Sequence, residues 1–165
     1  MLEFLYNKIF VNIVVGRVNT TVYIETVSKK NLISSVEESF KTTSLDSNIE
    51  SFIAKNIVES PYYYISILDT ANTQGVFAKC DTKSITSNIN RENFSLKCIK
   101  NEWSCYTPKS ELEILKNSWS SIGLDFIFSP FLILSNFFKD KIDAKMSLYI
   151  LEEESHISLM IFFAF

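Results

Sequence analysis

The sequence has 165 residues, of which 47% are hydrophobic and 21% are charged, and its formal net charge is −3. A chain of this length buries an adequate core as one globular domain, so it requires neither disulfides nor metals for stability. Acidic and basic residues are interspersed, which excludes the basic stripe needed to bind a nucleic-acid backbone. No run approaches the roughly 20 consecutive apolar residues of a membrane-spanning helix.

The three cysteines are Cys80, Cys98 and Cys105. Their odd number and the absence of CxxC spacing fit a reducing compartment better than a secreted disulfide framework. We therefore expect a cytoplasmic protein.

The first part of the chain, residues 9–40, alternates between apolar and polar residues and is rich in β-branched side chains. Turn residues at 16–19 and 29–31 divide it into a three-stranded meander, although its third member is also compatible with a short helix. Ser47 and Glu50 then form a capping box that predicts a helix ending before Pro61.

The middle of the chain begins with YYYISILD, a predicted strand that is apolar on both faces. GVFAKC and FSLKCIKNEWSCY follow, and we interpret them as an added hairpin around the polar loop 81–93, which we expect to be mobile.

The last third, residues 107–165, alternates helices and strands. Thr107 and Pro108 predict the start of a helix that Gly123 ends, and LDFIF is a short buried strand. The next helix starts at Ser129 and is apolar nearly all round, as expected for a helix between a sheet and another layer. Two final strands form a hairpin through EEES. The sequence therefore predicts an α/β fold with a mixed sheet, a three-stranded meander followed by alternating helices and strands, and helices on both faces.

Two segments resemble phosphate-binding loops. VVGRVNTTVYIE is similar to a first loop of the type IDIGSSSVKAVEL, with Gly16 at its glycine, and LYILEEESHISLMIFF lies where a second domain opens with a similar loop. GLDFIFSPFLIL resembles the strand and helix before that second loop. With this order of elements, the chain resembles the first half of the actin-like ATPase fold, especially the PilM and GspL cytoplasmic proteins of type IV pilus and type II secretion machines.

The resemblance implies an actin-like, ribonuclease H-like first subdomain over residues 1–145, with a hairpin insertion around 76–106. Residues 146–165 would then be the start of a second subdomain or a terminal hairpin. Active members carry an acidic residue two positions before the first glycine to position magnesium and water, and here that position is Val14. The run 152–154 puts three glutamates where the second loop has its glycine. Because the nucleotide of this fold lies between two halves, we expect no enzymatic activity and no cofactor.

The resulting hypothesis is a non-enzymatic cytoplasmic scaffold at the inner-membrane face, peripheral to the membrane through its partner in a pilus, secretion, DNA-uptake or flagellar-type machine. The resemblance implies a PilN-like inner-membrane protein, or its cytoplasmic peptide, as partner and a secretion ATPase as neighbour; a homo-oligomer is a further alternative. Two other functions stay open: a nucleotide-binding actin-like ATPase whose second half is missing from this chain, and a stand-alone α/β module with an unrelated ligand.

Few residues are candidates for chemistry. His156 with Glu152 or Glu154 would supply too few ligands for zinc, and a solvated acidic turn accounts for the same residues. Serine hydrolase chemistry lacks its G-x-S-x-G motif. Nothing in the sequence brings a cysteine to His156, and Cys98 and Cys105 are typical of small buried residues in strands.

The candidate polar site is Asp69, which ends a strand at the carboxyl edge where α/β folds gather ligands, although a turn-forming aspartate explains the same residue. The terminal LMIFFAF is apolar on both faces and must be covered by something. We therefore expect Phe162, Phe163 and Phe165 to pack inside or to form a partner-binding surface.

Overall fold

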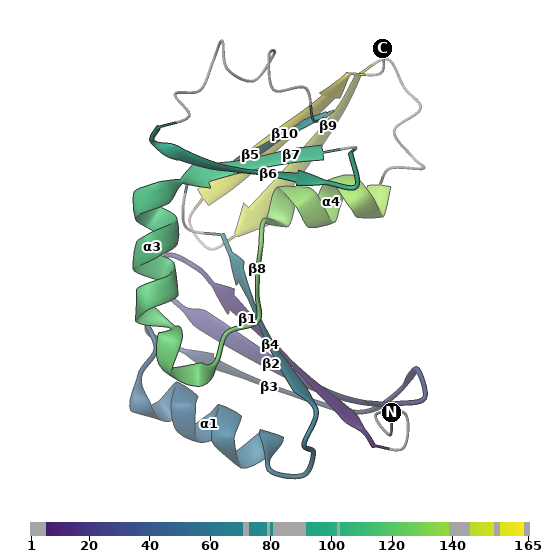
Figure 1. Ribbon diagram of the computed structural model, residues 1–165, viewed down its shortest axis with the longest axis vertical. Coiled ribbons are helices and arrows are strands. Elements are labelled where there is room, and N and C mark those ends of the chain that lie inside the picture. The colour runs from purple at the N-terminus through teal and green to yellow at the C-terminus, as the bar shows by residue number, and fades with distance from the viewer. Residues whose placement is uncertain are drawn as a thin grey trace. The chain divides into compact units, whose positions relative to one another are not determined.

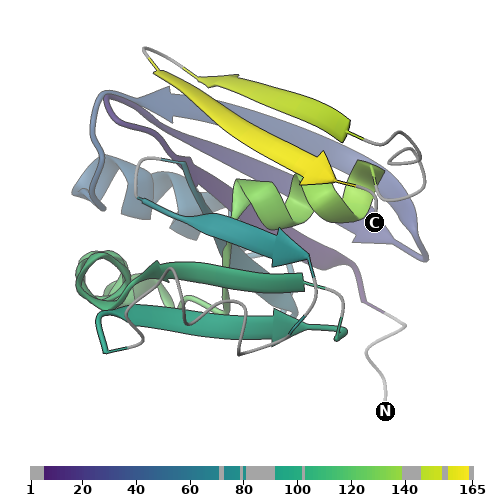
Figure 2. The same ribbon diagram turned by 90° about the horizontal axis from the view of Figure 1, so that it is seen from above.

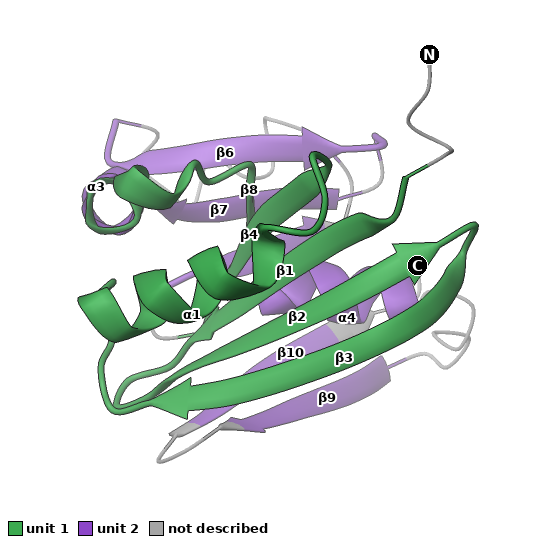
Figure 3. Cartoon of the chain, turned by 90° about the horizontal axis from the view of Figure 1, so that it is seen from below, with its two compact units in different colours: residues 1–70, 116–128 green, residues 71–115, 129–165 purple. Residues whose placement is uncertain are grey.

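The computed structural model describes residues 6–70, 73–78, 80, 92–101, 103–138, 146–153 and 156–163. The chain forms two compact units, one from residues 1–70 and 116–128 and the other from residues 71–115 and 129–165 (Figure 3). The boundary expected after residue 145, where a second subdomain of the actin-like fold would begin, stays a prediction. Residues 81–91 of the polar loop and Phe165 lie outside the described residues.

The first unit is built on a five-stranded mixed sheet (Figure 1). Its strands are β1 (Lys8–Val15), β2 (Thr20–Ser28), β3 (Asn31–Phe40), β4 (Tyr63–Asp69) and β8 (Phe126–Phe128). Their order is β3-β2-β1-β4-β8, with β2 antiparallel to both β1 and β3, and with β1, β4 and β8 parallel. The predicted mixed α/β sheet with its three-stranded meander is therefore confirmed, and the third member of the meander is a strand.

The core of this unit lies on one face of the sheet. Alternate residues of β1 are buried because successive side chains of a strand point to opposite faces. The helix α1 (Ser47–Ile57) lies across one face (Figure 3), and its apolar residues Ile49 and Ile53 are buried. Its N-cap is Asp46, whose carboxylate accepts from the backbone N–H groups of the second and third helical residues. The predicted capping box starting at Ser47 was therefore displaced by one residue.

The turn between β2 and β3 is made by Lys29 and Lys30, which both have positive φ angles, 47° and 75°. Positive φ at both central residues is what a two-residue hairpin turn requires, but the left-handed region costs a side-chain-bearing residue about 1 kcal/mol. We expect Lys30→Gly to raise the free energy of unfolding by about 0.5–1 kcal/mol in urea denaturation. Lys55→Gly, an exposed change within α1, should lower it by about 1 kcal/mol. A loss of stability in both variants would contradict this account.

The second unit contains a three-stranded antiparallel sheet and a separate hairpin (Figure 2). The sheet has the order β5-β7-β6 and consists of β5 (Gly75–Ala78), β6 (Phe94–Ile99) and β7 (Trp103–Pro108). The insertion predicted as a hairpin thus has three strands. The hairpin consists of β9 (Met146–Glu153) and β10 (His156–Phe163).

The helix α3 (Lys109–Ser118) starts later than predicted, because Thr107 and Pro108 are the last residues of β7. The Thr107 hydroxyl donates to the Thr73 carbonyl over 3.2 Å rather than capping the helix. After α3, a 3₁₀ turn (Ser120–Ile122) ends at Gly123, whose φ of 72° lies in the left-handed region. The predicted helix end at this glycine is therefore confirmed.

The helix α4 (Pro130–Phe138) packs on one side only. The ring of Phe138 stacks on that of Tyr149 in β9, with centroids 4.8 Å apart, and Ser135 is buried. On the other side Ile133 and Phe137 are exposed, the latter by 70%. The expectation that this helix is covered all round was wrong, since an apolar composition does not ensure two neighbouring layers. That helices cover both faces of the five-stranded sheet stays a prediction, because α4 belongs to the second unit.

Candidate functional site

The carboxyl ends of β1 and β4 lie side by side, at the kind of edge where open α/β sheets bind ligands. Asp69 and Val15, the last residues of these strands, are paired in register. The Asp69 side chain is 6% exposed. Thr70 donates both its backbone N–H and its hydroxyl to the Val15 carbonyl, each over 3.1 Å. The structure thus places Asp69 at the expected edge but buried in it, and its role as a site residue stays a prediction.

The turn that follows β1 is closed on itself. The Gly16 N–H donates to the Asn19 carbonyl over 2.9 Å, and the buried Thr20 donates its hydroxyl to the Thr42 carbonyl over 2.7 Å. Phosphate cradles use backbone N–H groups that point at the ligand. In this turn the glycine N–H points back into the chain instead. No group of three or more His, Cys, Asp or Glu side chains that could hold a metal ion occurs among the described residues.

A polar pair that sequence reasoning missed lies in the middle of the sheet. The Ser66 hydroxyl donates to the Asn12 side-chain oxygen over 2.7 Å, next to the stacked rings of Phe10 and Tyr64. Asn12 interrupts the apolar run of β1 in the sequence, but only the register of β1 against β4 shows that Ser66 is its partner. The Ser66 hydroxyl proton and the Asn12 side-chain oxygen are both used in this bond, so the pair supports the register of β1 against β4.

The hairpin of the second unit has one apolar face open to solvent. Leu148 is paired in register with Ile161, and Ile150 with Leu159. Six side chains of this face are each 54–63% exposed: Met146, Leu148, Ile150, Ile157, Leu159 and Ile161. We call these six residues the hairpin apolar face. On the opposite face Met160 is buried. Contiguous exposed apolar surface of this kind marks interaction sites in soluble proteins.

The predicted contact residues Phe162 and Phe163 lie in β10, where their backbones pair with Ser147 and Met146. Their side chains, like Phe165, lie outside what the structure describes. The same holds for the side chain of His156, whose backbone pairs with Glu153. The sequence pointed to this hairpin through its phenylalanines, whereas the exposed side chains that the structure identifies are aliphatic.

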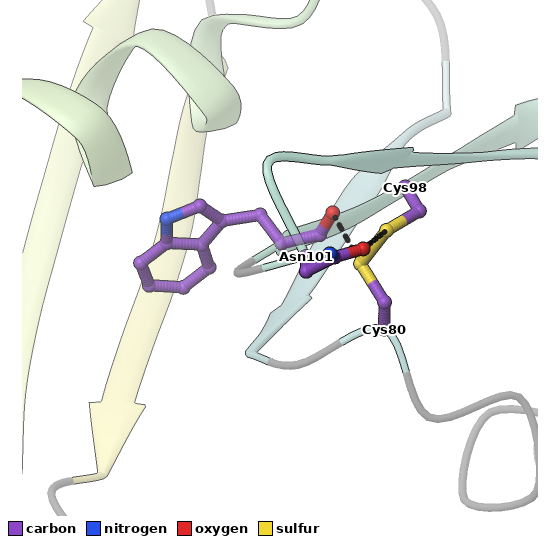
Figure 4. The surroundings of a disulfide bond; sticks show 4 residues. Cys80, Cys98 and Asn101 are labelled. Atoms are coloured by element: carbon purple, nitrogen blue, oxygen red, sulfur yellow. Dashed lines mark hydrogen bonds between the residues drawn. A yellow bond between two sulfur atoms is a disulfide. The ribbon is translucent and has the colours of Figure 1, made fainter.

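A disulfide joins Cys80, which follows β5, to Cys98 in β6 (Figure 4). The Trp103 carbonyl oxygen lies 3.3 Å from the Cys80 sulfur, and the Asn101 side-chain oxygen lies 3.6 Å from that of Cys98. Disulfide sulfurs carry no proton, so these are contacts in the oxidised chain, and the same oxygens could accept from the two thiols after reduction. The expectation that Cys98 is a small buried residue was wrong, since it is exposed and paired.

Cys105 is the remaining free cysteine. Burial raises the pKa of its thiol from 9.0 to about 11. Because the thiolate is the nucleophile, this cysteine is poorly suited to catalysis at neutral pH.

We expect native Cys105 to react with iodoacetamide at pH 8 at least about tenfold more slowly than in the urea-unfolded chain, since its pKa falls back to the ordinary range on unfolding. The native rate should keep rising as the pH approaches 11. Time-resolved mass spectrometry of the modified chain measures both rates. Equal native and unfolded rates at pH 8 would show that the thiol is not shielded.

The fold has a counterpart among solved structures. A protein of Bacteroides thetaiotaomicron VPI-5482, described as having an actin-like ATPase fold and unknown function, matches with a TM-score of 0.57 at 16% sequence identity. The match covers 94% of this chain and 65% of that protein, so the chain spans less than two thirds of its length. At this identity the likeness shows the fold alone, and it confirms the predicted actin-like fold. It does not distinguish the PilM or GspL type from other members.

At the level of sequence, no curated protein matches this chain. No helix among the described residues is long and apolar enough to cross a membrane. The family model described as "Domain of unknown function (DUF8569)" matches residues 6–135, which is more than three quarters of the 165 residues and includes the whole five-stranded sheet. The chain, an actin-like α/β fold with an added three-stranded sheet, therefore belongs to the DUF8569 family.

Proposed function

We propose that this chain is a non-enzymatic scaffold or adaptor that binds a protein of the inner membrane, in a pilus, type II secretion, DNA-uptake or flagellar-type machine. The observation that carries the proposal is the hairpin apolar face. Its six exposed side chains are apolar. Glu152, which pairs with Ile157 at one end of the hairpin, is the charged residue in register with them. A partner that covers this face removes apolar surface from water, which favours association.

The partner proposed is a PilN-like protein or its cytoplasmic peptide. An extended peptide can pair with the free edge of a hairpin through main-chain hydrogen bonds while its alternate side chains meet the apolar face. Phe162, Phe163 and Phe165, in and after β10, stay proposed contact residues of the same surface.

Two features of the carboxyl edge support a role without catalysis. Val14 supplies no oxygen ligand where an active member of the fold has an acidic residue. The Gly16 N–H, which a phosphate would need, is occupied by the Asn19 carbonyl.

The proposal places the protein in the cytoplasm, at the membrane face through its partner. The Cys80–Cys98 disulfide argues in the other direction, because disulfides persist chiefly in oxidising compartments. Trapping thiols with an alkylating agent in intact cells, followed by mass spectrometry, decides between them. Two alkylated cysteines at positions 80 and 98 would favour the cytoplasm, and an intact disulfide would overturn that placement.

Capture from detergent-solubilised inner membranes tests the proposed partner binding. We expect the wild-type chain to retain an inner-membrane protein that the variant Leu159→Glu loses, because a buried carboxylate opposes association. Ile114→Glu changes a similarly exposed apolar residue of α3 and is the matched control, expected to bind like the wild type. Direct titration of the purified captured protein then confirms the contact. Equal capture by Leu159→Glu, with its fold checked by circular dichroism, would rule out the hairpin apolar face.

A second candidate function is nucleotide binding, which is favoured by the actin-like fold and by the buried carboxylate of Asp69 beside the turn after β1. A ligand that binds only the folded chain raises its melting temperature. A shift in millimolar ATP and magnesium that Asp69→Asn abolishes would support this function over the scaffold. No shift is the outcome expected from the scaffold proposal.

A further inference from the structure

Strand β3 lies at one edge of the five-stranded sheet (Figure 3). It pairs with β2 on one side, and no other described strand pairs with it. Nine of its ten residues are exposed, so neither of its faces is covered along this length. An edge of this kind presents a row of unpaired backbone N–H and C=O groups that can accept a further strand.

The charges along this edge are segregated. Lys29 and Lys30 form the turn at its beginning, and Glu37 and Glu38 lie in its second half; all four side chains are exposed. Between them, around Ser34, the strand is uncharged. The strand is therefore basic at its beginning and acidic in its second half, and Lys41, also exposed, follows its end.

We propose that β3 pairs with β3 of a second copy of this chain, antiparallel and around a two-fold axis near Ser34. In that arrangement Glu37 and Glu38 of each copy lie alongside the Lys29–Lys30 turn of the other, so both ends gain opposite charges. The pairing is self-complementary and closes at two copies, as a two-fold contact does. It joins the two five-stranded sheets into one continuous sheet. The inference adds a self-association site to the proposed function and uses residues other than those of the hairpin apolar face.

The direction of pairing follows from the same charges. A parallel arrangement would set the glutamates of one copy against those of the other, and like charges across a sheet are destabilising. The antiparallel arrangement also brings exposed apolar side chains of the two copies, Leu32, Ile33 and Val36, toward one another across the axis. Ile33 is the extra residue where the register of β3 against β2 shifts, so the outer edge is bent at this point. The two-fold axis places the two bends symmetrically on either side of Ser34.

One added strand pair buries less surface than a permanent dimer requires, and we therefore expect a weak dimer that depends on concentration. Its ion pairs are exposed, so rising salt should weaken it further. Sedimentation velocity over a range of protein and salt concentrations measures both effects.

A charge exchange tests the contact. The double variant Glu37→Lys/Glu38→Lys makes the edge basic throughout, and Lys29→Glu/Lys30→Glu makes it acidic throughout. Each variant alone should dimerise at least about tenfold more weakly than the wild type, because like charges then meet at both ends. An equimolar mixture should recover the dimer, now between one basic and one acidic copy, with opposite charges at both ends. Hydrogen exchange of the β3 amides should slow in the mixture and not in either variant alone.

The control is Glu59→Lys/Glu113→Lys, which makes the same change in net charge at two exposed glutamates outside β3 and should dimerise like the wild type. A wild-type chain that stays monomeric at the highest concentration overturns the proposal and leaves the edge to a different partner. So does a dimer that neither charge variant weakens. Because these changes leave the hairpin apolar face intact, capture of a membrane protein by the monomeric variants would show that the proposed function holds even where the dimer fails.

Discussion

Replacing Ile67 by alanine is expected to lower the free energy of unfolding of the first unit by about 3 kcal/mol. Ile67 lies in β4 and is fully buried, and it pairs in register with Ile13 on β1 and with Ile127 on β8. Hydrogen bonds hold both neighbouring strands at a fixed spacing, so they cannot close in on the cavity that the lost carbons leave. Urea denaturation followed by circular dichroism measures the change.

The matched control is Ile33→Ala, which makes the same replacement on the exposed strand β3 of the same unit. Its expected cost is below about 1 kcal/mol, because little apolar surface leaves the core. Similar losses in the two variants would mean that the face of β4 bearing Ile67 is not the core of this unit.

Removing the Cys80–Cys98 disulfide is expected to lower the stability of the second unit by about 3 kcal/mol. The bond links residues 18 positions apart, and a loop of this size loses about that much conformational freedom in the unfolded chain when it is closed. The variant Cys98→Ser, or the wild type with a reductant, should therefore unfold at a lower denaturant concentration.

Two comparisons separate the effect of the disulfide from the effect of replacing a cysteine side chain. Cys105→Ser keeps the disulfide, so its unfolding should still respond to reductant. Cys98→Ser should not respond, because it has no bond left to reduce. If reductant leaves the wild-type transition unchanged, the disulfide is absent or contributes nothing to stability.

Much of the first unit could be predicted from the sequence because its signals are local. The alternation of β1 follows from the two-residue period of a strand, and the turns after β1 and after β2 lie where predicted, at residues 16–19 and 29–31. The helix that follows and the glycine that ends the 3₁₀ turn were likewise found within a residue or two. The actin-like order of elements was also visible, and the solved counterpart confirms it.

The second unit was harder to predict because its local sequence signals were overridden by pairing between residues far apart in the chain. Thr107 followed by Pro108 has the form of a helix start, yet pairing with β6 keeps both residues in β7. An odd number of cysteines pointed to free thiols, whereas the antiparallel arrangement brings Cys98 to Cys80. Neither the spacing of the cysteines nor the composition of the chain predicts that these two residues lie close together.

The candidate sites likewise combine features set by neighbouring residues with features set by residues far apart in the chain. The sequence by itself determined most of the strands of the first unit and that Asp69 ends one of them, since both depend on neighbouring residues and their period. Only the tertiary structure decided that Asp69 is buried beside Val15, that β3 is an edge strand of the sheet, and that the aliphatic face of the last hairpin is open. The physical reason is that exposure depends on which elements pack together, and strand pairing is set by contacts between residues far apart in the chain.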